Sequence, residues 1–299
     1  MKITLTGSLG NISKPLAEFL IAAGHEITVI SSDPKKKTDI EMLGAIAAMG
    51  TIADTDFLVS AFKGADAIYT MVPPNWGVSN YREYIATTGA GYRDAIKASG
   101  VKHVVNLSSI GAHLANGTGP IAGLYDVEQA LNDLEGVGIR HLRAGIFFTN
   151  YFFDIGMIRN MGIMGNNYSG QSQLVMVHPR DIAAAAAREI QTLFEGKSHH
   201  YIVGDECQAA AATHLLGAAI GKPELAWVQF SDEETFAGMT AAGMSAAIAE
   251  VYVEMGRAIN SGILFEDFNR NKLYHSGSIK LSDFVHEFTN VYQSQQQQQ

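Results

Sequence analysis

Close to its N-terminus the chain reads Thr6-Gly7-Ser8-Leu9-Gly10-Asn11-Ile12-Ser13, between a short β-rich run and the first helical stretch. Glycines at these two positions allow the backbone to approach a ligand closely, and the start of the following helix supplies free N–H groups and a positive dipole end. The spacing is Gly-x-x-Gly-x-x-Ser rather than Gly-x-Gly-x-x-Gly, but Ser13 is small enough for close packing of helix on strand. We therefore predict a turn that binds the diphosphate of a dinucleotide, in preference to a glycine-rich turn without a ligand. Its contacts would come from Gly7, Ser8, Leu9, Gly10, Asn11 and Ile12.

The first half of the chain alternates short β-rich runs with longer helical stretches. This alternation is typical of successive βαβ units with parallel strands. Strands are predicted at Lys2–Thr6, Glu26–Ile30, Gly44–Met49, Ala67–Met71, His103–Leu107 and Ile139–Ala144, and helices at Pro15–Ala23, Asp54–Phe62, Tyr81–Ala98 and Tyr125–Leu134. The predicted fold class is α/β, with a Rossmann-type doubly wound parallel sheet.

From Ile146 onward the alternation loosens. A strand over 175–177 and helices over 182–194, 209–220, 232–242 and 245–261 predict a smaller, mostly helical lobe on the substrate side. We expect residues 1–150 to form the NAD(P)-binding Rossmann domain and residues 151–292 to form this lobe, interleaved with the end of the sheet. Residues 293–299 are expected to be a disordered, glutamine-rich tail.

The composition narrows the class of protein. Of the 299 residues, 47% are hydrophobic and 17% are charged, which is typical of a folded globular chain. The formal net charge of -9 disfavours nucleic acid and membrane surfaces as partners. The single Cys207 cannot form an internal disulfide, no apolar run reaches the length of a membrane span, and the N-terminus is unlike a signal peptide. We therefore expect a cytoplasmic protein.

The end of the second predicted strand should contact the ribose of the cofactor, about 20 residues after the glycines. There the chain reads Ile30-Ser31-Ser32-Asp33-Pro34-Lys35-Lys36-Lys37. A pair of serines near lysines suits a 2′-phosphate, so Ser31, Ser32 and Lys35 favour NADP, whereas Asp33 keeps NAD open. For the three lysines, the solvated start of a helix is the alternative.

Further motifs follow the glycine turn in order. They are Gly50 to Asp54, Gly64-Ala65-Asp66-Ala67, Met71-Val72-Pro73-Pro74, Val104-Val105-Asn106-Leu107-Ser108-Ser109 and Leu142-Arg143-Ala144-Gly145-Ile146-Phe147-Phe148-Thr149-Asn150. Together they resemble the NmrA-like family of atypical short-chain dehydrogenase/reductase proteins, which includes NAD(P)H-dependent quinone reductases and redox-sensing regulators. The resemblance implies that Asp54 lies near the adenine and that Met71, Val72 and Pro73 line the cofactor. It also implies that Asn150 and its aromatic neighbours face the substrate pocket.

The expected catalytic residues depart from the pattern of the wider superfamily. Classical members use Tyr-x-x-x-Lys, in which the lysine charge makes the tyrosine hydroxyl more acidic. This chain has Tyr125-Asp126-Val127-Glu128-Gln129, with an uncharged glutamine in place of the lysine. Tyr125 is therefore either a general acid or a helix residue at the pocket edge. Ser108 and Ser109 stand where the resemblance places the hydrogen bond to a substrate carbonyl, with strand-end capping as the alternative.

Other kinds of site are disfavoured. The chain has no Gly-x-Ser-x-Gly elbow of an α/β-hydrolase. His199-His200 has no histidine partner three or four residues away, so we expect an exposed loop there and no metal site. His113 is expected to be a loop histidine, with a substrate contact as the less favoured alternative.

These observations favour an NAD(P)H-dependent oxidoreductase that passes a hydride to a quinone or a similar planar acceptor, its small-molecule partner. Such an acceptor can take its proton from water, so the missing lysine is tolerated, and Phe147, Tyr151 and Phe152 are expected to stack against it. The main alternative is a non-catalytic NAD(P)-binding redox sensor that acts on a protein partner. A nucleotide-sugar epimerase or dehydratase ranks third, because it shares the fold but needs an active tyrosine–lysine pair.

Overall fold

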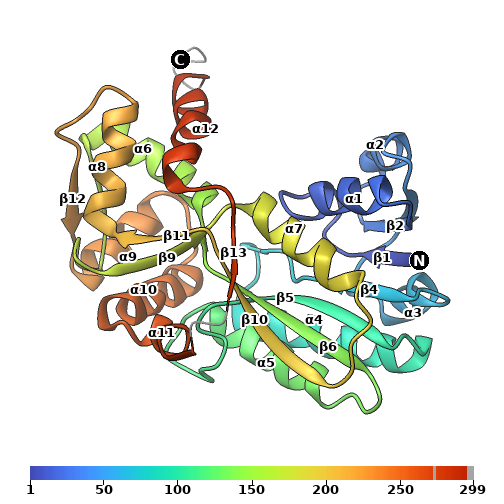
Figure 1. Ribbon diagram of the computed structural model, residues 1–299. Coiled ribbons are helices and arrows are strands. Elements are labelled where there is room, and N and C mark those ends of the chain that lie inside the picture. Colours follow the sequence, from blue (N-terminus) through green and yellow to red (C-terminus); the bar gives the residue numbers. More distant parts are fainter. Residues whose placement is uncertain (272–273, 295–299) are drawn as a thin grey trace.

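An eight-stranded parallel sheet forms the centre of the molecule (Figure 1). The computed structural model describes residues 1–271 and 274–294. The strands lie in the order β13-β10-β6-β5-β4-β1-β2-β3, and each pairs in parallel with its neighbours. Their bounds are β1 Lys2–Leu5, β2 Glu26–Ser31, β3 Ile46–Met49, β4 Ala67–Thr70, β5 His103–Ser109, β6 Gly138–Ala144, β10 Lys197–Val203 and β13 Tyr274–Ser276.

Helices cover both faces of this sheet (Figure 1). On one face α1 (Ser13–Ala22) packs against α7 (Pro179–Ile190), and the other face carries α3 (Thr55–Phe62), α4 (Tyr81–Ser99) and α5 (Ile121–Asn132). Each layer is held by its own buried apolar cluster. A short η1 (Pro34–Lys36) and α2 (Lys37–Met42) connect β2 to β3.

Helix α4 illustrates how the local sequence sets these elements. The side chain of Asn80 accepts a hydrogen bond from the Glu83 N–H at 3.1 Å and caps the start, and Gly100 ends the helix in the left-handed region with φ of 79°. Gly89 allows close approach to α5, because a Cβ there would lie 2.7 Å from Cγ2 of Val127. Between the two ends, buried residues recur at helical spacing, namely Tyr81, Ile85, Thr88, Gly89, Tyr92, Ala95 and Ile96.

The strand order reverses between β1 and β4. The connection through α1 covers one face and the connection through α4 covers the other, which leaves a crevice at the carboxyl ends of β1 and β4. Ligands of open parallel sheets bind at such a switch point. The glycine turn follows β1 directly and therefore lies at this crevice.

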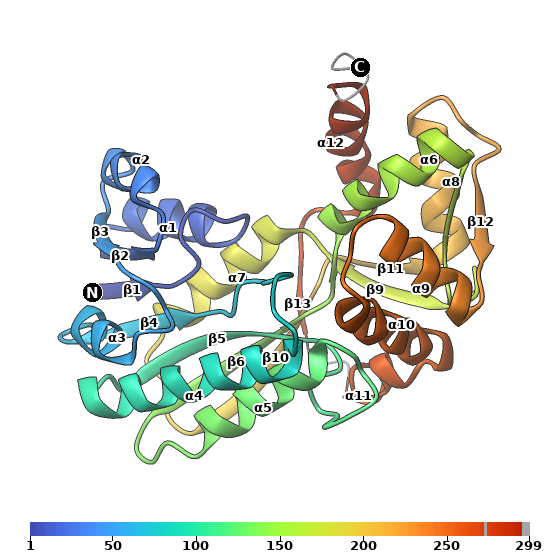
Figure 2. The same ribbon diagram turned by 180° about the vertical axis from the view of Figure 1, so that it is seen from behind.

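The remaining elements build a smaller lobe beside the sheet, with its own aromatic core (Figure 2). Its strands form a three-stranded sheet, β11-β9-β7, and a two-stranded sheet, β12-β8. The strand bounds are β7 Ile146–Phe147, β8 Ile163–Asn166, β9 Gln173–Val177, β11 Asp205–Gln208 and β12 Ala226–Gln229. The helix bounds are η2 Phe148–Asp154, α6 Ile155–Met161, α8 Ala209–Ala219, α9 Asp232–Ala241, α10 Ala246–Ser261, η3 Ile263–Phe265, α11 Glu266–Asn271 and α12 Leu281–Ser294.

The structure confirms the α/β class and the doubly wound parallel sheet. The predicted helix start at Tyr125 was wrong, because Pro120 allows α5 to begin at Ile121. The tail was expected to begin at Gln293, but Gln293 and Ser294 lie within α12. Residues 295–299 lie outside the described residues. Strands β10 and β13 join the central sheet and α7 packs on it, although all three lie beyond residue 150. The domain boundary at residue 150 therefore stays a prediction. Within the described residues, the helices lack the combined length and hydropathy that a bilayer span requires.

Candidate functional site

The glycine turn packs closely against the start of α1 and the segment after β4. Gly7 has φ of 90°, and a Cβ there would lie 2.5 Å from Oγ of Ser13 and 3.0 Å from Sδ of Met71. Ser13 is buried and donates to the carbonyl of Thr6 at 2.8 Å, which holds the start of α1 against the end of β1. Ser13 thus packs α1 closely against β1, and binding of a dinucleotide diphosphate by Gly7 and Gly10 stays a prediction.

A serine pair connects this turn to the end of β2. Ser8 adopts a positive φ of 53°, its N–H donates to the carbonyl of Ile30 at 3.1 Å, and its hydroxyl donates to Oγ of Ser31 at 2.8 Å. Ser31 is buried and its hydroxyl positions the turn by accepting from Ser8, so its cofactor contact stays a prediction, whereas Ser32 and Lys35 are exposed. Asp33 uses one carboxylate oxygen to cap η1, accepting from the N–H of Lys35 at 3.0 Å. Lys35 therefore lies in an exposed helical turn, as the solvated helix start predicts. Its contact with a 2′-phosphate stays a prediction.

The segment after β4 forms the other side of the crevice. Met71, Val72 and Pro73 are half-buried. The hydroxyl of Tyr92 donates to the carbonyl of Met71 at 2.7 Å, and that of Tyr84 donates to the carbonyl of Pro73 at 2.8 Å. Tyr84 and Tyr92 of α4 thus hold residues 71–73 in place beside the glycine turn. Farther along, the exposed Asp54 caps α3 by accepting from the N–H of Phe57 at 3.1 Å.

A buried ion pair lies behind the ends of β5 and β6. Arg143 donates to both oxygens of Glu128, at 3.0 and 2.7 Å, and the hydroxyl of Ser108 donates to Oε1 of Glu128 at 2.5 Å. Burial opposes ionisation of Glu128, but the hydrogen bonds from Arg143 and Ser108 hold the pKa of its carboxyl below the ordinary value. Because the Ser108 hydroxyl is committed to Glu128, this placement favours a positioning role over the predicted substrate contact.

Tyr125 lies half-buried on α5 without a cation in the position of the missing lysine. Gln129 is exposed, Asp126 pairs with Arg82 at 2.7 Å, and Arg143 is held by Glu128. Each carboxylate near Tyr125 in the sequence is therefore neutralised by an arginine. A general-acid role for Tyr125 stays a prediction, as does a substrate contact for Ser109, whose half-buried hydroxyl donates to the carbonyl of Ile110 at 2.9 Å.

The predicted aromatic stack requires a correction. Tyr151 is buried and its hydroxyl donates to Sδ of Met176, while Phe152 stacks on Phe288 of α12 with ring centroids 6.3 Å apart. Phe152 thus holds α12 on the lobe, and Tyr151 is too deeply buried to offer a free ring face to an acceptor, whereas an acceptor contact from the half-buried Phe152 stays a prediction. Contacts from the half-buried Phe147 and the exposed Asn150 stay predictions.

Trp76 is an aromatic residue that the sequence analysis did not single out. It is 45% exposed in the loop after β4, stacks on Tyr81 with ring planes 5° apart, and lies 5.5 Å from the ring of Tyr252 on α10. Figure 2 shows this loop extending from the end of β4 toward α10. The exposed tryptophan therefore stands between the sheet and the lobe. Its position three residues after Pro73, next to the segment expected to line the cofactor, is the feature of the sequence that could have identified it.

One expectation about histidines also changes, and another holds. His199 and His200 lie in β10 rather than in an exposed loop, because residues 197–202 of β10 pair with β6. His200 contacts Glu189 and His275, partners that a search of neighbouring sequence positions cannot find. His113 lies in the loop after β5, as expected, and its Nδ1 is buried without a hydrogen-bond partner in the described part of the chain. Burial lowers the pKa of this imidazole and favours its neutral form.

The segment that carries the glycine turn matches a known family. Residues 7–134 match the sequence profile of a family described as NAD(P)H-binding. This segment is therefore similar to NAD(P)H-binding proteins. Binding of NAD(P)H is thus supported by the family match as well as by the geometry of the turn.

Solved structures share the fold of this NAD(P)H-binding chain across almost its full length. An NADPH-dependent quinone oxidoreductase from Escherichia coli, complexed with NADPH, has a TM-score of 0.82 at 23% identity, over 96% of this chain and 99% of that chain. A triphenylmethane reductase from Citrobacter sp., complexed with NADP(H), has a TM-score of 0.78 at 21% identity, over 95% and 99% of the two chains. These matches confirm the predicted α/β fold with its doubly wound parallel sheet.

A curated relative adds a third comparison. The NAD(P)H azoreductase of Xenophilus azovorans is 23% identical over 254 residues, which is 85% of each chain. The NAD(P)H-binding chain is thus related to oxidoreductases over most of its length.

Proposed function

We propose that this chain is an NADPH-dependent oxidoreductase that reduces a quinone or a similar planar acceptor. The observation that carries the proposal is the glycine turn fixed to the ends of both β2 and β4, through the Ser8–Ser31 hydrogen bond and the hydrogen bond from the Met71 N–H to Oγ1 of Thr6. The similarity of the chain to a quinone oxidoreductase, a triphenylmethane reductase and an azoreductase supports a planar acceptor.

Separate groups of residues would bind and orient the different parts of the cofactor. NADPH, when bound, supplies the hydride. Residues 7–12 would hold its diphosphate, Ser32 and Lys35 its 2′-phosphate, and residues 71–73 would line it at the end of β4. Arg82 interacts electrostatically with Tyr125 but is paired with Asp126, which suits an acceptor that gains one hydride and takes one proton from water.

A test of acceptors separates this proposal from the alternatives. The purified protein is mixed with NADPH and, in separate assays, a soluble benzoquinone, an azo dye or a triphenylmethane dye, and NADPH absorbance is followed. We expect one NADPH oxidised per quinone reduced. Tight binding of NADPH without turnover of any acceptor would contradict the proposal and favour a redox sensor, which should bind the oxidised and reduced cofactors with different affinities.

Lys35 is expected to set the preference for NADPH over NADH. The Lys35→Glu variant should bind NADPH about 10-fold more weakly, because it places a negative charge beside the 2′-phosphate, and should bind NADH with little change. Calorimetric titration with both cofactors measures the difference. Lys37→Glu is a matched control, since the Lys37 ammonium lies 3.9 Å from Glu41 on α2. Equal weakening of NADPH and NADH by Lys35→Glu would mean that Lys35 does not read the 2′-phosphate.

Trp76 is expected to contribute a stacking surface for the planar acceptor. Trp76→Ala should raise KM for the quinone about 5- to 10-fold with a smaller change in kcat, since loss of an aromatic contact costs about 1 kcal/mol or slightly more. Trp76→Phe should restore most of the affinity. Trp227→Phe is a control, because that ring lies in the lobe and donates to the carbonyl of Tyr168. An unchanged KM in Trp76→Ala would remove Trp76 from the acceptor site.

A further inference from the structure

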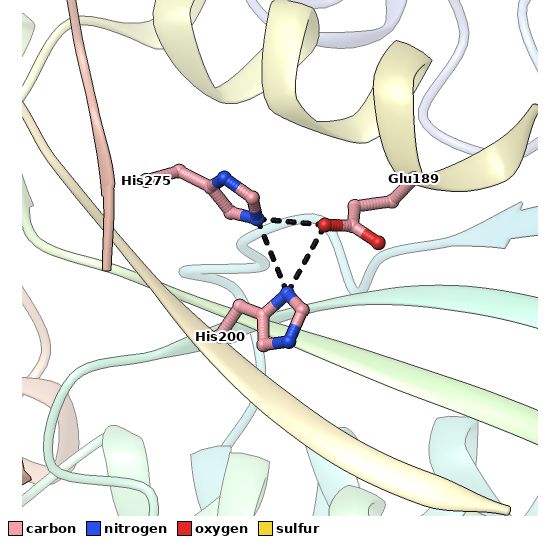
Figure 3. A group of neighbouring side chains, drawn as sticks. All are labelled: Glu189, His200 and His275. Carbon is pink, nitrogen blue, oxygen red and sulfur yellow. Dashed lines mark hydrogen bonds and ion pairs between the residues drawn. The ribbon is translucent and has the colours of Figure 1, made fainter. Parts of the chain in front are cut away.

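Three side chains from separate elements meet at the edge of the central sheet. Glu189 comes from the last turn of α7, His200 from β10 and His275 from β13 (Figure 3). Oε1 of Glu189 lies 2.6 Å from Nε2 of His275 and 3.0 Å from Nδ1 of His200, and the two nitrogens are 3.1 Å apart. The three atoms therefore form a compact triangle.

The strand register explains why the two histidines meet. β10 and β13 are parallel, and His275 lies opposite Ile202. Residues two apart on a strand point to the same face, so His200 shares a face with Ile202 and with His275. Helix α7 covers this face and directs Glu189 toward both rings.

The triangle has nearly the size of one face of a tetrahedral metal site. Nitrogen and oxygen ligands at about 2.0–2.1 Å from zinc are separated by roughly 3.3 Å, so two of the three sides need to open by only a few tenths of an ångström. Without a cation, two N–H groups aimed at the same Glu189 oxygen would bring their hydrogens together. A cation instead uses the lone pairs of both ring nitrogens and the carboxylate oxygen.

The surroundings suit three protein ligands and one open position. The side chains of His200 and His275 are each 32% exposed, which leaves access for an ion and a water, whereas that of Glu189 is 8% exposed. Arg140 donates to the other Glu189 oxygen, Oε2, at 2.5 Å and to Ser198 at 3.1 Å, so it orients the carboxylate while leaving Oε1 to the histidines. The positive charge of Arg140 reduces the affinity for a cation and makes a reversibly bound ion the expectation.

We propose that Glu189, His200 and His275 bind a divalent transition-metal ion, with zinc the ion that two imidazoles and one carboxylate suit best and water as the fourth ligand. The ion would fasten β13 to β10 and α7. Four strands, β10, β6, β5 and β4, separate β13 from β1, so the site is separate from the glycine turn. Its role is therefore to stabilise the junction of the C-terminal segment with the sheet.

The test uses full-length protein without a histidine tag, stripped with a chelator and titrated with Zn²⁺ or Co²⁺ alone. We expect one equivalent of Zn²⁺ to bind and to raise Tm, and one equivalent of Co²⁺ to give the visible absorption bands of four-coordinate cobalt. His200→Asn and His275→Gln should each weaken binding at least about 100-fold and abolish the bands, because only two ligands remain. Both replacements keep a hydrogen-bond donor for Glu189, so the fold can be verified by the unchanged Tm of the metal-free variants.

His286→Asn is the matched control, since His286 is exposed on α12. It should bind both metals as the unmodified protein does. The proposal is overturned if the unmodified protein shows no binding at one equivalent, or if His200→Asn and His275→Gln retain the cobalt bands. NADPH affinity should be the same in all variants, which keeps this test independent of the proposed redox function.

Discussion

Replacement of Arg143 by methionine is expected to destabilise the fold by about 3–5 kcal/mol. Glu128 is 2% exposed, and Arg143 supplies two of the three hydrogen bonds that its carboxylate receives from side chains in the structure. Without the arginine, a buried negative charge remains with only the Ser108 hydroxyl as donor. Urea denaturation at neutral pH measures the loss directly.

Arg82→Met is a matched control for this prediction. Arg82 also makes two hydrogen bonds to one carboxylate, at 2.7 and 2.9 Å, but its side chain and that of Asp126 are 40% and 27% exposed. A partly solvated pair of this kind contributes about 1 kcal/mol or less. Equal losses in the two variants would show that burial of the Arg143–Glu128 pair does not govern its energetics.

The pH dependence gives a second readout of the same pair. In the unmodified protein the lowered pKa of Glu128 stabilises the fold fully above its ordinary value of 4.5, and this contribution disappears as the pH falls through the lower folded-state pKa. In Arg143→Met, burial without the partner raises the pKa of Glu128, so the carboxyl takes up a proton in the folded state. The stability difference between the two proteins should therefore shrink as the pH falls from 7 toward 4.5.

A double variant separates the pair from its individual charges. Glu128→Leu combined with Arg143→Met removes both buried charges and should recover most of the lost stability, because apolar side chains can replace a buried ion pair at little cost. A double variant as unstable as Arg143→Met would locate the loss in the contacts of Arg143 with Tyr201 and Asp267 instead.

The parts of the fold that the sequence predicts are those set by local patterns. The glycine turn, the parallel strands and the long helices of residues 2–144 each have a signal within about 20 residues, such as the cap at Asn80. At Lys35–Lys37 the sequence left two alternatives open, a contact with the 2′-phosphate and the solvated start of a helix. There, ion pairs of Lys36 with Asp39 and of Lys37 with Glu41 accompany a helical turn, while Lys35 faces solvent.

The parts that sequence reasoning missed depend on contacts between distant residues. An apolar pattern marks Tyr151 and Phe152 as rings that need a partner, but it does not say whether a ligand or α12 supplies it. In the same way, Ser108 and Ser109 are adjacent hydroxyls, and the strand geometry directs Ser108 toward Glu128. Glu189 and His275 are 86 residues apart, and they meet because β13 pairs with β10 while α7 packs on β10.

Gly10→Trp is expected to weaken NADPH binding at least about 100-fold, a loss of about 2.7 kcal/mol in binding free energy. Gly10 is exposed, its N–H donates to the carbonyl of Gly7 at 3.1 Å, and its own carbonyl accepts from the N–H of Lys14 at 3.1 Å. An indole at this position would occupy the space over the turn in which the diphosphate is predicted to lie. Calorimetric titration with NADPH and NADH checks the expected loss, which should be similar for both cofactors because both carry the diphosphate.

The fold should tolerate this replacement, which makes the binding loss interpretable. A Cβ on Gly10 would lie 3.1 Å from the carbonyl oxygen of Gly7, so a shift of a few tenths of an ångström accommodates it, whereas at Gly7 the positive φ and the Cβ contact of 2.5 Å with Ser13 would strain the turn itself. Gly238→Trp is the control, because Gly238 is exposed on α9 and a Cβ there meets nothing within 4 Å. Unchanged NADPH affinity in Gly10→Trp, with Tm preserved, would exclude the turn as the cofactor site. Loss in Gly10→Trp alone would place the diphosphate at the end of β1, at the switch point where the chain's strand order reverses.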